Sequence, residues 1–131
     1  MRLIRALQQI VVVVDDDHWI REAIERLLKA AEFCAVAFSS AESALESGLL
    51  ARSSCLITDV RLEGMQGLDL LSRIKFSYPT LPVIVISGHL DEQIKQRALS
   101  GGAAVVLSKP LDPDGLLHAI QSAIVCSRRD I

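Results

Sequence analysis

The sequence is poor in aromatic residues and has no long apolar run. Aromatics make up 4% of the 131 residues whereas 50% are hydrophobic, so the core must consist mainly of Val, Ile, Leu and Ala. Such residues suit buried parallel strands packed under helices. No apolar segment approaches the roughly 20 residues of a membrane-spanning helix. The first apolar stretch breaks at Gln8 and Gln9 and ends on three aspartates, which is not a signal peptide. We therefore expect a cytoplasmic protein without membrane contact.

Positive charge is also scarce, and the cysteines show no pattern. The formal net charge is −2 and no basic run occurs, so direct contact with nucleic acid has little electrostatic support. Cys34, Cys55 and Cys126 are odd in number, widely spaced and without a paired metal-ligand motif. This usage indicates reduced, mostly buried thiols in a reducing compartment.

The length and the regular spacing of apolar runs predict one domain. At 131 residues the chain has no room for a second domain of ordinary size. We expect a lead-in over residues 1–9, the domain over 10–126, and a polar tail or the start of a linker over 127–131. No internal repeat or low-complexity segment interrupts it.

Five short apolar runs alternate with segments of helical periodicity. The predicted strands cover residues 10–14, 34–38, 55–58, 83–86 and 104–107. The predicted helices begin at Asp16 or Asp17, at a capping box formed by Ser39 and Glu42, near Leu68, at Asp91, and at Asp112 followed by Pro113. Short connections and right-handed crossovers predict an α/β fold, a doubly wound five-stranded parallel sheet with helices on both faces.

Polar residues follow four of the predicted strands. They are Asp15 to Asp17, Asp59, Ser87 and Lys109. If the strands are parallel neighbours, these side chains meet at the sheet edge where open α/β sheets bind ligands. Crowded carboxylates are relieved by a raised pKa or by a bound cation, and oxygen ligands favour Mg²⁺ over zinc. A simpler interpretation is that Asp16 and Asp17 only cap a helix.

Four motifs occur together in one order along the chain. They are Val14 to Asp17, Thr58 to Leu62 with Gly67, Ile86 to Gly88, and Ser108 to Pro110. From about Ile10 to Ala123, this pattern resembles the receiver domain of bacterial two-component response regulators, the CheY-like superfamily with a flavodoxin-like fold. The resemblance implies that Asp59 accepts a phosphoryl group from a sensor histidine kinase or a phosphotransfer protein. It also implies Mg²⁺ bound by Asp15, Asp16, Asp59 and the main-chain carbonyl of Arg61.

The resemblance assigns roles to two further residues and to one surface. Lys109 matches the lysine that pairs with the phosphoryl oxygens, and its peptide bond to Pro110 is expected to be cis. Ser87 matches the hydroxyl that moves toward the phosphoryl group. The surface of the fourth helix, fifth strand and fifth helix then changes shape and provides a face for a homodimer. The implied protein is a phosphoacceptor in transcription regulation, not a turnover enzyme.

Two rival interpretations stay open at this point. Val106 stands where the family usually has Tyr or Phe, and Glu63 where proline is usual. Both departures leave room for a pseudo-receiver, which has the same fold but acts only as a protein-binding module. A phosphohydrolase of the haloacid-dehalogenase class would need a second Asp two residues after Asp59, and Arg61 occupies that place.

Overall fold

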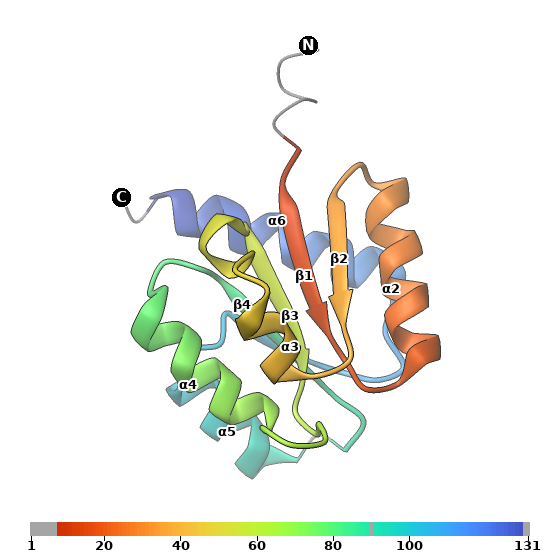
Figure 1. Cartoon of the computed structure of the whole chain (residues 1–131). Coiled ribbons are helices and arrows are strands. Elements are labelled where there is room, and N and C mark those ends of the chain that lie inside the picture. The colour runs from red at the N-terminus through yellow and green to blue at the C-terminus, as the bar shows by residue number, and fades with distance from the viewer. Residues whose placement is uncertain (1–7, 90, 130–131) are drawn as a thin grey trace.

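A parallel sheet forms the centre of the molecule. The computed structural model describes residues 8–89 and 91–129, and its five strands lie in the order β2-β1-β3-β4-β5 (Figure 1). The strands are β1 (Ile10–Val14), β2 (Cys34–Phe38), β3 (Cys55–Asp59), β4 (Val83–Ser87) and β5 (Val105–Ser108). All neighbouring pairs are parallel. The predicted fold class is confirmed, and each strand lies within one residue of its predicted bounds.

Helices follow the strands as the periodicity predicts. They are α2 (His18–Ala30), α3 (Ala41–Glu46), α4 (Gly67–Ser77), α5 (Glu92–Ser100) and α6 (Pro113–Arg129), with a 3-10 turn η1 (Leu50–Arg52). Asp17 caps α2, since its carboxylate accepts the N–H of Trp19 at 2.9 Å, and Asp91 caps α5 in the same manner. Because α6 runs to Arg129, part of the expected tail is helical. Most of the expected lead-in, residues 1–7, and residues 130–131 lie outside the described chain.

The predicted capping box at the start of α3 is wrong by one residue. Ser40, not Ser39, is the N-cap, and its hydroxyl accepts the N–H of Ser43 at 3.1 Å. Glu42 does not turn back to the cap; its carboxylate accepts the N–H of Met65, from a loop 23 residues further along the chain. A long-range partner therefore replaces the local one that the motif predicts.

Alternating strand residues divide the core into two layers. Val12 and Val14 of β1 pack in the layer under α3, α4 and α5. Val11 and Val13 pack in the layer under α2 and α6, on the opposite face (Figure 1). The side-chain period of two in a strand produces this division, and burial on both faces explains why the strands are apolar throughout.

The order of the strands defines where a ligand can bind. The chain leaves β1 toward β2 at one edge of the sheet, whereas β3 leads through β4 to β5 at the other edge. The crevice between the carboxyl ends of β1 and β3 is therefore the topological switch point of the sheet. Val14 pairs with Thr58, and Asp59 with Ile86, so these strands end nearly level. None of the helices in residues 8–89 and 91–129 is long and apolar enough to cross a membrane.

The three cysteines differ in exposure, which predicts their reactivity. Cys55 is buried in β3, and burial raises the pKa of its thiol to about 12. Cys34 is half-buried, and Cys126 is exposed on α6, so the expectation of mostly buried thiols fails for Cys126. We expect a thiol reagent at pH 8 to label Cys126 first, Cys34 more slowly and Cys55 only after unfolding, because the thiolate is the reactive form. Mass spectrometry of peptides from a labelling time course measures this order, and equal rates for Cys55 and Cys126 would contradict it.

Candidate functional site

An ion-pair network joins three strand ends at the switch point. The ammonium nitrogen of Lys109 lies 2.8 Å from Oδ2 of Asp59 and 3.1 Å from Oδ2 of Asp15. Both carboxylates are buried, and the Lys109 side chain is only 18% exposed. The structure thus brings together a cation and two acids that the sequence separates by up to 94 positions, as 109 − 15 = 94.

Main-chain bonds at the strand ends place these three side chains. Asp15 follows β1, and its N–H donates to the Phe38 carbonyl at 3.2 Å. Asp59 is the last residue of β3. The N–H of Lys109 donates to the Ser87 carbonyl at 2.9 Å, which extends the pairing of β4 with β5 to the lysine, and its peptide bond to Pro110 is cis, as expected. The main-chain hydrogen bonds of the sheet therefore fix the positions of the strand ends, and with them the positions of the Asp15, Asp59 and Lys109 side chains.

Three carboxylates in this crevice could hold a metal ion. Oxygen atoms of Asp15, Asp16 and Asp59 all lie within 4.8 Å of one another. Asp15 Oδ1 accepts the N–H of Asp17 at 2.9 Å, whereas the buried Oδ2 contacts Lys109 without a hydrogen bond. Asp16 is exposed, so the cluster opens to solvent on one side. An incompletely satisfied buried oxygen beside two other carboxylates, with solvent access, suits a hard cation that keeps part of its water shell.

Opposing effects set the protonation of the network. Burial raises the pKa of the Asp15 carboxyl, and the hydrogen bond from Asp17 and the Lys109 ammonium offset this only in part. Burial by itself would lower the pKa of Lys109, but its hydrogen bond to Asp59 and its ion pair with Asp15 outweigh this and raise that pKa. Lys109 therefore stays charged, while the ionised form of Asp15 carries a desolvation cost that a cation would relieve.

The main chain at each of the two buried acids makes a contact that the sequence patterns did not predict. A Cβ on Gly67 would lie 1.9 Å from the Asp59 carbonyl oxygen, so the first residue of α4 packs directly on the end of β3. The side chain of Arg21, one turn into α2, donates to the Asp15 carbonyl at 2.9 Å. Gly67 appears in the motif that we noted, but only the structure shows why glycine is needed there.

The remaining predicted residues lie at the rim of the site. Ser87 is buried at the end of β4, one position beyond the partner of Asp59, and its hydroxyl accepts the N–H of His89 at 3.2 Å. Arg61 is exposed two residues beyond Asp59, and its N–H donates to Asp59 Oδ1 at 3.3 Å. The roles predicted for the Ser87 hydroxyl and for the Arg61 carbonyl stay predictions.

The arrangement suits transfer of a charged group to one carboxylate. Asp59 has Lys109 on one oxygen, the Arg61 N–H on the other, and Asp15 with Asp16 beside it. Phosphoryl transfer needs charge neutralisation and positioning more than it needs a strong base. A lysine and a carboxylate cluster that could hold a cation, both beside one carboxylate, would supply both.

Comparison with known proteins gives consistent matches over nearly the whole chain. A family model described as the response regulator receiver domain matches residues 11–121. Nodulation protein W of Bradyrhizobium diazoefficiens is 38% identical over 120 residues, which cover 92% of this chain and 53% of that protein. The transcriptional regulatory protein FixJ of the same organism is 33% identical over 114 residues, 87% of this chain and 56% of that protein. The chain thus spans about half the length of the curated relatives it matches.

Solved structures agree with the sequence matches. A response regulator receiver domain protein from Clostridium thermocellum has a TM-score of 0.88 at 28% identity, covering 94% of this chain and 99% of that chain. A close superposition over nearly the whole of both chains means that they share the same fold.

Replacing Gly67 by Ala tests the close packing against Asp59. The new methyl group would overlap the Asp59 carbonyl, so we expect the free energy of unfolding to fall by about 3 kcal/mol. Gly88→Ala is the matched control, since a Cβ there meets nothing closer than Lys109 Cδ at 3.9 Å; its change should stay within about 0.5 kcal/mol. Urea denaturation measures both values, and equal stabilities of the two variants would contradict the steric argument.

Replacing Lys109 by Met tests the ion-pair network. Without the ammonium, two buried carboxylates repel each other, so we expect a loss of about 2 to 3 kcal/mol at pH 7. The folded-state pKa of Asp15, already raised by burial, would then lie further above its unfolded value. Stability of the variant should therefore recover relative to wild type as the pH falls and the carboxyl is protonated.

Lys29→Met is the control for removal of a positive charge. Lys29 is 65% exposed and lies 4.0 Å from Glu25, so its replacement should change stability by no more than about 0.5 kcal/mol at any pH. Urea titrations between pH 4 and 8 compare the two variants. A Lys109→Met deficit that grows as the pH falls would show that carboxylate repulsion is not its cause.

Proposed function

The chain belongs to the response regulator receiver domain family, and from this premise we propose that Asp59 is phosphorylated by a sensor histidine kinase or a phosphotransfer protein in a Mg²⁺-dependent reaction. The observation that carries the proposal is the position of Asp59. Its buried carboxylate contacts Lys109 at 2.8 Å and shares a cluster with Asp15 and Asp16. Lys109 also contacts Asp15, but the Asp15 side chain is fully buried, whereas the Asp59 side chain is 10% exposed and can be reached by a donor.

Different residues of this chain act as the nucleophile, balance the charge and bind the metal ion during the transfer. A carboxylate oxygen of Asp59 attacks the phosphorus of the donor's phosphohistidine; the new P–O bond forms as the P–N bond breaks, and the imidazole nitrogen keeps that electron pair. Lys109 stays cationic and balances charge on the phosphoryl oxygens. Asp15, Asp16, Asp59 and the Arg61 carbonyl would hold Mg²⁺, which when bound neutralises charge on the acceptor and the incoming group.

The response to phosphorylation arises at residues that lead to one surface. The added group carries about −1.5 to −2 charge and three acceptor oxygens. Ser87 reorients toward it, and the loops after Ser87 and Lys109 lead into α5 and α6. The face made by α5, β5 and α6 then shifts between two packings. Val106 is half-buried in β5 and packs on the core under α5, so an aliphatic side chain serves where an aromatic rotamer switch is usual.

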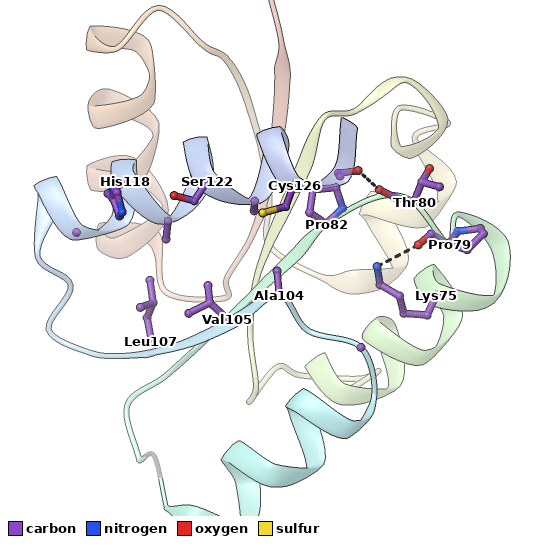
Figure 2. A pocket seen from close by; sticks show the side chains of 15 residues that line it. Lys75, Pro79, Thr80, Pro82, Ala104, Val105, Leu107, His118, Ser122 and Cys126 are labelled. Carbon is purple, nitrogen blue, oxygen red and sulfur yellow. Dashed lines mark hydrogen bonds between the residues drawn. The ribbon is translucent and has the colours of Figure 1, made fainter. Parts of the chain in front are cut away.

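A groove on this face offers a surface for a homodimer or an effector. It encloses about 860 Å³ between β5 and α6. Figure 2 shows His118, Ser122 and Cys126 of α6 above Val105 and Leu107 of β5, with Lys75 of α4 near the far end. An apolar floor with polar edges, beside an edge strand, is typical of a protein-binding surface.

We place the receiver function in residues 10–126 of a cytoplasmic protein. Its output is transcription regulation, as the names of the relatives suggest. A net charge of −2 supports action through a further segment or a protein partner, with no nucleic-acid contact by this domain. It acts as a phosphoacceptor that assists its own phosphorylation and dephosphorylation.

Labelling with a small-molecule phosphodonor tests the proposal. We expect the purified chain to gain one phosphoryl group from acetyl phosphate with Mg²⁺, and to lose that gain with EDTA, as measured by intact-mass spectrometry. Asp59→Asn should gain none because the nucleophilic carboxylate is absent. Asp69→Asn, which alters an exposed aspartate on α4, is the control and should label as wild type does.

Failure of labelling would favour the rival interpretation. If the wild-type chain gains no mass and also fails to bind beryllofluoride with Mg²⁺, the domain is a pseudo-receiver. Labelling that survives in Asp59→Asn would place the acceptor elsewhere.

A further inference from the structure

The loop that leaves the acceptor strand is held at its tip by a residue of α3. This loop, residues 60–66, joins Asp59 to α4. A carboxylate oxygen of Glu42 accepts the N–H of Met65 at 2.8 Å. The same carboxylate closes on Gly64, where a Cβ would lie 2.7 Å from Glu42 Oε2. Glu42 therefore contacts two successive residues of the loop.

The base of the loop is fixed by other means. Val60 and Leu62 are buried in the core under α3, α4 and α5. The N–H of Gly67 donates to the Val60 carbonyl at 2.9 Å, and the Gln66 side chain donates to the Leu62 carbonyl at 2.8 Å. These bonds close the loop on itself, but they leave its exposed tip, Glu63 and Gly64, without support from the core.

The tip of the loop contains an exposed glycine, whose backbone needs a restraint to stay in one conformation. Gly64 has a φ of +80°, in the left-handed region, and glycine loses more backbone entropy on ordering than other residues. An acceptor on a neighbouring helix restricts that freedom. The hydrogen bond from Met65 also lowers the pKa of Glu42, so a full negative charge faces this N–H at neutral pH.

The other end of the loop touches the acceptor carboxylate itself. The N–H of Arg61 donates to Asp59 Oδ1 at 3.3 Å, whereas Lys109 contacts Oδ2. The orientation of the Asp59 carboxylate therefore depends on the main chain at Arg61. The Gln66 side chain, one residue after Met65, is bonded to the carbonyl of Leu62, one residue after Arg61, so a displacement of Met65 can reach this bond through Leu62.

We infer that Glu42 is a positioning residue for the phosphoacceptor site: by holding Gly64 and Met65, it keeps the main chain of Arg61 aligned with the carboxylate of Asp59. The inference rests on the proposed function, because cation binding and phosphoryl transfer are what this alignment serves. Glu42 touches neither the acceptor nor the carboxylate cluster, and its effect passes through the loop.

Three variants separate this role from loss of charge or of helix stability. Glu42→Ala removes the acceptor. Glu42→Gln removes the same charge but keeps a side-chain carbonyl of the same length, so it should rescue most of the effect. Glu46→Ala removes an exposed glutamate from the same helix and is the matched control. Each is compared with wild type for Mg²⁺ affinity by calorimetry, for amide hydrogen exchange of Arg61 and Met65 without metal, and for melting temperature.

We expect Glu42→Ala to weaken Mg²⁺ binding about threefold to tenfold, the range that one net hydrogen bond can contribute. Exchange at Met65 and Arg61 should both accelerate, while Glu42→Gln and Glu46→Ala stay near wild type. A merely structural role for Glu42 would lower the melting temperature and leave the Mg²⁺ affinity of the folded protein unchanged.

Two results would overturn the inference. In one, Glu42→Ala accelerates exchange at Met65 but leaves Arg61 exchange and Mg²⁺ affinity unchanged. This result would show that Glu42 restrains Met65 without affecting the site. In the other, Glu46→Ala weakens Mg²⁺ binding as much as Glu42→Ala. A wild-type chain that binds no Mg²⁺ would instead count against the proposed function, and Arg61 exchange in the metal-free variants would still decide the role of Glu42.

Discussion

The contact of one ammonium group with two buried carboxylates is the constraint on which the site depends. Lys109 reaches Asp15 and Asp59 from a different strand end, and the local main-chain N–H groups that bond the two carboxylates, from Asp17 and Arg61, carry no positive charge. Buried charges are costly unless they are paired, so the fold must bring both carboxylates to within about 3 Å of the lysine. The parallel sheet does so because β1, β3 and β5 all end at the same edge.

The network places an ionisable group where its burial lowers the stability of the fold. Asp15 is ionised at a desolvation cost, which its raised pKa reflects, and its buried Oδ2 lacks a hydrogen bond. A core selected for stability alone would replace such a group with an apolar one. A cation bound beside this oxygen would relieve the cost, so the same electrostatic cost that weakens the metal-free fold would favour binding of the cation.

The connections at the site explain how a local charge change can reach a distant surface. The chain passes from Ser87 directly toward α5, and from Lys109 through the cis bond to Pro110 toward α6. Residues of β5 and α6 line the groove between these two elements (Figure 2). Any movement of these two side chains would therefore reach the proposed output face through short stretches of chain and a tightly packed core.

What the sequence determined by itself was the set of elements and the list of site residues. Apolar runs bounded by polar residues mark the five strands, and Asp15, Asp59 and Lys109 follow from their places at the strand ends. Such features are local, so a single sequence carries them. The tertiary structure decided the contacts between segments far apart in sequence: the partner of Glu42, the packing of Gly67 on Asp59, and which oxygen of Asp15 lacks a hydrogen bond. A capping box and a long-range acceptor use the same glutamate in the same local pattern. Whether Glu42 bonds the helix start or the distant loop depends on how close folding brings Met65 to its carboxylate.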